Sequence, residues 1–210
     1  MCISFLQYRP FPSAPLLVGS SLIEKVSCYK LLGVHLSDNL TWNKHVTYIV
    51  KKGSKRLYAL RVLKKCGLTD RQLILVYCSI IRSVLEYASP AWAGLTQYLS
   101  DHIESVQKRA LRIIFPNLCY VDALRKSGLL SLRQRREDAC ITFLKLSYSS
   151  SHLFRSLVPR VAHTRPYALR SGESVFVPVS SKTNRFENFC TIKYQNHLNI
   201  YVVSDIVFNI

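Results

Sequence analysis

The chain has 210 residues, of which 29 are Lys or Arg and 12 are Asp or Glu, so its formal net charge at pH 7 is +17. Hydrophobic residues make up 49% and charged residues 20%, a globular composition that excludes disordered, collagen-like and acidic-tail chains. A large positive charge on a chain with enough apolar residues for a core favours a polyanionic partner, which is nucleic acid or an anionic membrane surface.

The N-terminal 40 residues predict a short β element. A loose, proline-rich stretch comes first, and the apolar runs at 16–18 and 22–26 then predict a strand, a turn and a strand. Residues 29–36 (YKLLGVHL) predict a third strand, in which Gly33 marks a bulge or a close approach of backbones.

From Trp42 onward the apolar residues follow helical spacing. Thr69 with Gln72, and Ser131 with Gln134, form capping boxes, while Gly67 and Gly128 are placed to end helices. The predicted helices span residues 42–66, 70–89, 100–115, 120–127 and 131–148. The buried stripe of the second consists of Leu73, Val76, Tyr77, Ile80, Ile81, Val84 and Leu85.

Residues 149–190 are rich in Pro, Ser and Arg and predict a loosely ordered arm, and the last stretch could be helix or strand. The predicted fold class is therefore mainly α, with a short N-terminal β-hairpin element, a four- to five-helix bundle and a C-terminal arm. We divide the chain accordingly into residues 1–40, 41–148 and 149–210.

Positive charge is concentrated in the first long helix and just after it. Asp70 is the only acid in this region, and nine bases occur there: Lys44, Lys51, Lys52, Lys55, Arg56, Arg61, Lys64, Lys65 and Arg71. At about 100° per residue, Lys44, Lys51 and Lys55 lie within about 40° of one another, opposite the apolar stripe. This face is suited to a phosphate backbone, with Tyr48 and Tyr58 available to stack on bases or sugars. An ordinary solvated face is the alternative, although such faces usually mix charges of both signs.

Two smaller basic clusters admit two interpretations each. Lys108, Arg109 and Arg112 either contact nucleic acid or form ion pairs with Asp101 and Glu104. The other cluster consists of Arg133, Arg135 and Arg136, which either contact nucleic acid or form ion pairs with Glu137 and Asp138.

Features of catalytic, metal and membrane-bound proteins are absent from the sequence. Two-metal catalysis needs clustered carboxylates, and no P-loop, GxSxG or HExxH motif occurs. The seven cysteines include no Cys-x-x-Cys, which favours reduced thiols, and the nearest metal-ligand pair is Cys190 with His197. We therefore expect no catalytic residue, no cofactor, no metal and no small-molecule substrate. No stretch reaches the roughly 18 apolar residues of a membrane span, so we expect an intracellular protein, the nucleus included, without a signal peptide or a membrane partner.

Five segments, taken together and in order, resemble the C-terminal part of LINE-type, jockey-like non-LTR retrotransposon reverse transcriptases. The similarity covers about residues 20–145. The segments are YKLLGVHLSDNLTWNKHV (29–46), KKGSKRLYALRVLKK (51–65), VYCSIIRSVLEYASPAW (76–92), IESVQKRALRIIF (103–115) and YVDALRKSGLLSLRQRRED (120–138).

This resemblance implies a remnant of the palm with a primer grip at Leu32 and Gly33, followed by a thumb that holds the primer–template. The family's catalytic aspartates, and the Mg²⁺ that they bind, lie in a (Phe/Tyr)-Ala-Asp-Asp turn that this sequence lacks. The expected function is that of a truncated RNA-directed DNA polymerase fragment that binds an RNA–DNA or RNA duplex without polymerising. The expected contacts are Lys44, Lys51, Lys52, Lys55, Arg56, Lys108, Arg109 and Arg112.

Three alternatives stay open at this point. The chain is part of a longer, active reverse transcriptase that begins upstream of Met1, or a helical module that binds another protein, or an inert fragment of a mobile element. The sequence predicts no oligomeric state.

Overall fold

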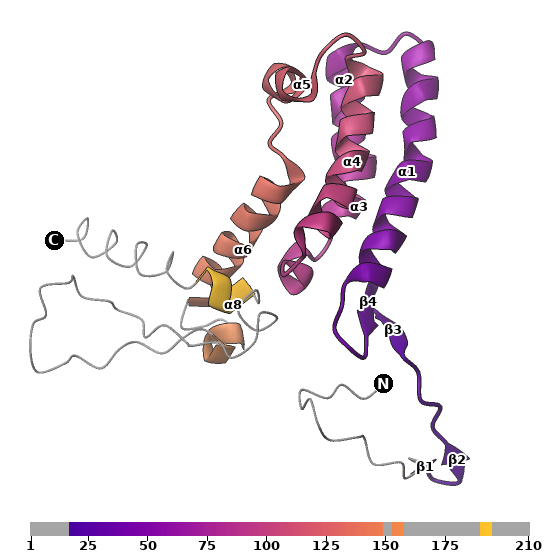
Figure 1. The fold of residues 1–210 in the computed structure, drawn as a ribbon, viewed down its shortest axis with the longest axis vertical. Coiled ribbons are helices and arrows are strands. Elements are labelled where there is room, and N and C mark those ends of the chain that lie inside the picture. The colour runs from indigo at the N-terminus through magenta and orange to yellow at the C-terminus, as the bar shows by residue number, and fades with distance from the viewer. Residues whose placement is uncertain (1–16, 149–152, 158–189, 195–210) are drawn as a thin grey trace, which may run out of the picture.

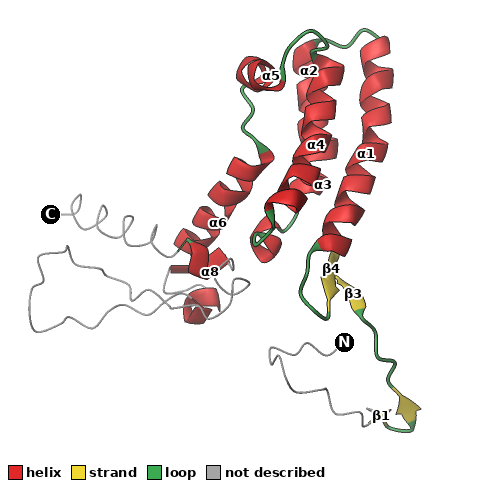
Figure 2. Ribbon diagram, in the orientation of Figure 1, coloured by secondary structure: helices red, strands yellow, loops and turns green. Residues whose placement is uncertain are grey.

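The computed structural model describes residues 17–148, 153–157 and 190–194 (Figure 1). Helices dominate, and two short hairpins precede them (Figure 2), which confirms the predicted mainly-α fold class. The elements are β1 (Leu17–Val18), β2 (Ser21–Leu22), β3 (Cys28–Leu31), β4 (Val34–Ser37), α1 (Asn43–Lys65), α2 (Asp70–Val76), the π-helix η1 (Tyr77–Arg82), α3 (Ser83–Glu86), the 3-10 helix η2 (Ser89–Trp92), α4 (Gln97–Ile114), α5 (Tyr120–Ser127), α6 (Leu132–Tyr148), the 3-10 helix η3 (Leu153–Leu157) and α8 (Cys190–Lys193).

The third predicted strand is in fact a hairpin. β3 and β4 pair antiparallel with Leu31 opposite Val34, so Leu32 and Gly33 form a two-residue turn. Both turn residues have positive φ, 46° and 87°, as a type I′ turn requires. Gly33 adopts this conformation readily, and it reverses the chain where the apolar pattern alone predicted a continuous strand or a bulge.

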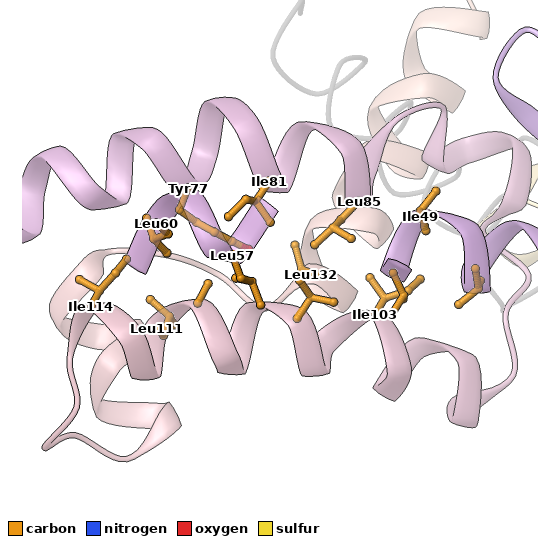
Figure 3. Close-up of a cluster of buried hydrophobic side chains, with 14 of the residues drawn as sticks. Ile49, Leu57, Leu60, Tyr77, Ile81, Leu85, Ile103, Leu111, Ile114 and Leu132 are labelled. Atoms are coloured by element: carbon orange, nitrogen blue, oxygen red, sulfur yellow. The ribbon is translucent and has the colours of Figure 1, made fainter. Parts of the chain in front are cut away.

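Helix α1 packs its apolar side against α4 and against the segment from η1 to α3. Its buried residues include Val46, Ile49, Val50, Gly53, Leu57 and Leu60. Figure 3 shows Leu57 and Leu60 in one cluster with Tyr77 of η1 and Leu111 of α4. At Gly53 the helices are so close that a Cβ atom would lie 3.0 Å from Leu85 Cδ2 and 3.4 Å from Val106 Cγ1.

The segment from α2 to α3 is helical throughout but changes its winding. The Thr69–Gln72 capping box forms as predicted. The π-helix that follows has more residues in each turn than an α-helix. The buried side chains of this segment accordingly recur every four positions, at Leu73, Tyr77, Ile81 and Leu85. Ile80, predicted in the buried stripe, is 41% exposed as a result.

Two polar side chains hold the later helices to α4 and α1. The buried carboxylate of Glu104 accepts hydrogen bonds from the backbone N–H groups of Leu132 and Arg133, at 3.2 and 3.3 Å. Both groups belong to the N-terminus of α6, whose partial positive charge stabilises the carboxylate. Lys64 of α1 donates to the carbonyl oxygens of Ile113 and Ile114, the latter at 2.8 Å, and so caps the C-terminal end of α4.

A second apolar cluster lies on the other side of α6. Cys140 and Leu144 of α6 pack there against Cys190 and Tyr194. Most of the predicted C-terminal arm lies outside the described residues. The parts that are described, η3 and α8, are short helices that contact α6.

Replacement of Gly53 by valine should destabilise the fold by about 2 kcal/mol and lower the melting temperature by roughly 4–8 °C. The added methyl groups overlap buried side chains of Leu85 and Val106. The matched control is Ala59→Val on the exposed side of α1, which should cost less than about 1 kcal/mol through helix propensity alone. Equal melting temperatures of the two variants would contradict the close contact.

His45 should make the stability depend on pH. It is buried on α1, and its Nδ1 accepts the backbone N–H of His35 in β4 at 3.3 Å. Burial, and secondarily the neighbouring His35, lowers the pKa of His45 to about 4. In the unfolded chain, His45 binds a proton near pH 6.5. The contribution of neutral His45 to the free energy of unfolding is therefore fully present above pH 6.5 and is lost as the pH falls towards 4.

Urea denaturation of the wild-type protein at pH 7 and pH 5 should differ by about 2 kcal/mol through this residue. The His45→Gln variant should lose that part of the pH dependence. His102→Gln, which removes a half-buried imidazole from α4, controls for the loss of a histidine elsewhere. A pH dependence that is the same in His45→Gln and the wild type would refute the assignment.

Candidate nucleic-acid interface

The exposed side of α1 carries cations without acids. Residues 43–65 contain no Asp or Glu, and the opposite side of the helix is buried and apolar. Tyr58, which is 70% exposed, lies among these cations. Five exposed cations of α1 have no hydrogen bond or ion pair within the described part of the chain: Lys44, Lys51, Lys55, Arg61 and Lys65.

A hydrogen bond connects this side of α1 to α4. Arg109 donates from Nη2 to Ser54 Oγ over 2.7 Å, and from Nε to the carbonyl oxygen of Ser105 over 3.3 Å. Ser54 lies one helical turn from Lys51, and Arg112 lies one turn from Arg109. Two basic clusters that are far apart in the sequence are therefore neighbours in the fold.

We refer to this combined area as the α1–α4 basic surface. Residues 105–118, which form the second half of α4 and the following loop, also contain no acid. The surface consists of Lys44, Lys51, Lys55, Arg61 and Lys65 of α1 and Lys108, Arg109 and Arg112 of α4, all of them exposed.

Two predicted contacts of α1 lie outside this surface. The guanidinium of Arg56 donates to the carbonyl oxygen of Ile80 in η1, on the other edge of the helix. Lys52 lies 5.9 Å from the ring centre of Tyr48. Tyr48 itself is less available than predicted, because Lys30 donates to its hydroxyl at 3.4 Å, and this bond and the nearby lysine charges lower the pKa of Tyr48. Tyr58 is thus the better placed of the two tyrosines.

The acids of α4 do not neutralise its cations. Asp101 accepts a hydrogen bond from Gln97 Nε2 at 2.8 Å. Glu104 is buried and accepts the hydroxyl of Tyr120 in addition to the backbone of α6. Within the described part of the chain, neither carboxylate pairs with Lys108, Arg109 or Arg112. The structure therefore does not show the ion pairs that the alternative interpretation of this cluster predicted.

The arginines of α6 are structural. Arg133 pairs with Glu137 at 3.3 Å, as the ion-pair alternative predicted. Arg135 makes a two-pronged ion pair with Glu86 of α3, at 2.5 and 3.0 Å. Arg136 is buried and donates to Ser100 Oγ. This cluster therefore joins α6 to α3 and α4.

Leu32 and Gly33 lie at the tip of the β3–β4 hairpin. Leu32 is 83% exposed. The hydroxyl of Tyr87, which follows α3, donates to the Leu32 carbonyl oxygen at 3.0 Å. The hairpin tip is thus held beside the end of α3, and the Leu32 side chain points away from the core.

Ser54 was not predicted as part of the interface. No charge, motif or periodicity distinguishes it from other small polar residues, and only the packing of α4 beside α1 shows its role. Tyr120 was also missed, although its place at the first position of a short helix next to a basic segment was visible in the sequence.

The described residues hold no group of three or more His, Cys, Asp and Glu side chains that could bind a metal ion. His197, the predicted partner of Cys190, lies outside them. The described helices do not combine the length and hydropathy that a membrane crossing requires.

A family model matches residues 42–83, which run from the start of α1 into α3. It describes the N-terminal region of alkylated DNA repair protein alkB homolog 8. The match covers less than half of the chain. No curated protein and no solved structure matches the chain.

This finding contradicts the resemblance to LINE-type reverse transcriptases. The matched region includes the basic segment 51–65 and part of 76–92, and the family that the model describes is not a polymerase family. The predicted function as a truncated retrotransposon polymerase is therefore wrong, and the primer-grip role of Leu32 and Gly33 loses its basis. A helix with one apolar and one basic side is favoured wherever a packed helix meets phosphates, so this pattern does not distinguish the two families.

Proposed function

We propose that this protein binds double-stranded nucleic acid through the phosphate backbone, on the α1–α4 basic surface. The observation that supports this proposal best is the Arg109–Ser54 hydrogen bond, because it places the unpaired cations of two helices on one side of the fold. Exposed cations without acidic partners release condensed counterions when they meet phosphates, which is the main source of such affinity.

The dimensions of the surface favour a duplex. From Lys44 to Lys65 the helix rises by about 32 Å, at about 1.5 Å per residue. One turn of a B-form DNA duplex is about 34–36 Å long, so the cations of α1 span nearly a whole turn of such a duplex. The α4 cations broaden that row, which suits the width of a groove and its flanking strands.

The family match supports the same class of partner. The matching family is named for a protein of alkylated-DNA repair, whose substrate is nucleic acid, and its model matches a region that includes the whole of α1. We expect the lysines and arginines of this surface to meet phosphates rather than base edges, so binding should depend little on sequence. RNA, RNA–DNA and DNA duplexes are all candidate ligands.

The proposal is tested by the affinity of the full chain for fluorescein-labelled duplexes of about 16 base pairs, titrated against salt. About five phosphate contacts should give a slope of about −4.5 in log K against log[salt] on DNA. The Lys51→Glu/Lys55→Glu variant should bind at least about tenfold more weakly and reduce the size of the slope by about 2.

The matched control is Lys126→Glu/Lys145→Glu, which changes the net charge equally but acts on α5 and α6. This variant should retain most of the affinity and nearly the whole slope. If both variants lost affinity equally, net charge rather than the α1–α4 basic surface would be responsible. An absence of duplex binding by the wild type at low salt would overturn the proposal.

A further inference from the structure

A cleft lies between α4 and α5, beside the α1–α4 basic surface. Its volume is about 350 Å³, at the lower end of the range of about 300–1,000 Å³ that is usual for small-molecule sites. The cleft is lined by Ser105, Lys108, Arg109, Leu111, Arg112, Leu118, Cys119, Tyr120 and Ala123. This volume is far too small for a duplex but is suited to a single nucleotide.

The charged part of the lining is entirely positive. Lys108, Arg109 and Arg112 contribute cations, and no lining residue is acidic. Arg109 is held in place by Ser54 and by the carbonyl of Ser105, whereas Arg112 has no partner among the described residues. One arginine is therefore preorganised, and another has all its donors available for a phosphate, which arginine can bind with two parallel hydrogen bonds.

The remaining lining is apolar and aromatic. Leu111, Leu118 and Ala123 supply aliphatic surface, and the ring of Tyr120 lies 5.4 Å from Lys108 Nζ. The hydroxyl of Tyr120 donates to Glu104 and accepts from Gln107 Nε2 at 3.0 Å, so the ring is fixed. Burial, together with the hydrogen bond and charge of Glu104, raises the pKa of Tyr120 well above its usual value, so the phenol adds no negative charge.

The start of α5 forms one wall of the cleft. Cys119 is the N-cap, and its Sγ accepts the backbone N–H of Asp122 at 3.5 Å. The amide of Tyr120 belongs to the first turn, which has no helical acceptor. The Asp122 carboxylate of the same turn accepts from Cys119 Sγ at 3.0 Å and pairs with Arg125, so it offsets the partial positive charge of the helix N-terminus. The positive potential of the cleft therefore comes from Lys108, Arg109 and Arg112.

We propose that the α4–α5 cleft holds one unpaired nucleotide of the bound nucleic acid, with its phosphate at Arg109 and Arg112 and its base against Leu118 and Tyr120. This inference rests on the proposed function, because the cleft shares these two arginines with the α1–α4 basic surface. A base is flat, so aliphatic and aromatic surface accommodates it without regard to its identity. The cleft would thus recognise a strand end or a bulge.

The test compares a blunt RNA duplex of about 16 base pairs with the same duplex carrying one unpaired nucleotide, placed at the 5′ end or the 3′ end. Wild-type protein should bind one of the extended duplexes about five- to tenfold more tightly than the blunt one, a typical gain for one stacked base. Arg112→Glu should weaken binding of every duplex and also abolish this preference.

Arg61→Glu is the matched control, because Arg61 belongs to the basic surface but does not line the cleft. It should weaken binding to a similar extent and keep the full preference. Leu118→Glu, which changes a partly exposed loop residue, should remove the preference while most of the blunt-duplex affinity remains.

The outcomes separate the two proposals. If the blunt duplex binds but neither extended duplex binds more tightly, the cleft assignment fails and the duplex surface stands. A preference that survives in both Arg112→Glu and Leu118→Glu also overturns the cleft assignment. If no duplex binds, the proposed function fails as well. A glutamate-rich peptide that displaced the extended duplex as effectively as an unlabelled copy of that duplex would show that the cleft selects negative charge alone. That result would contradict the proposal.

Discussion

The close contact of α1 with α4 determines where the charges of this protein lie. At Gly53 the absence of a side chain allows Leu85 and Val106 to approach the α1 backbone. The apolar side of α1 is thereby buried along its length, and most of its lysines and arginines occupy the side that remains in solvent. The same contact brings Arg109 to Ser54, so the basic clusters of two helices merge into one surface.

A buried polar network organises the other half of the fold. Glu104 accepts the first amides of α6 and the hydroxyl of Tyr120, while Gln107 joins Tyr77, Tyr120 and the chain before α6. A buried carboxylate is tolerated here because a helix N-terminus and several donors stabilise its charge. The network also keeps Glu104 away from the cations of α4, and it orients the ring of Tyr120 that lines the cleft.

The function of individual basic residues depends on which neighbour each one meets. Lys51 and Arg56 both belong to the basic segment of α1, yet Lys51 faces solvent beside α4 and Arg56 binds a carbonyl of the π-helix. Arg112 and Arg135 are both arginines in amphipathic helices, but only Arg135 has a carboxylate from another helix within reach. Density of charge along the sequence therefore overstates the number of residues that are free to bind phosphate.

The sequence by itself determined the main helices, the Thr69–Gln72 capping box and the mainly-α fold class, because helical periodicity and cap chemistry act over a few neighbouring residues. It also determined that α1 has a basic side. It did not predict the β3–β4 turn at Leu32 and Gly33 or the π-helix, since both depend on backbone conformations that the apolar pattern does not encode. Only the tertiary structure decided which cations are free, that Ser54 joins two clusters, and that α4 and α5 enclose a cleft, because these properties come from contacts between residues distant in sequence.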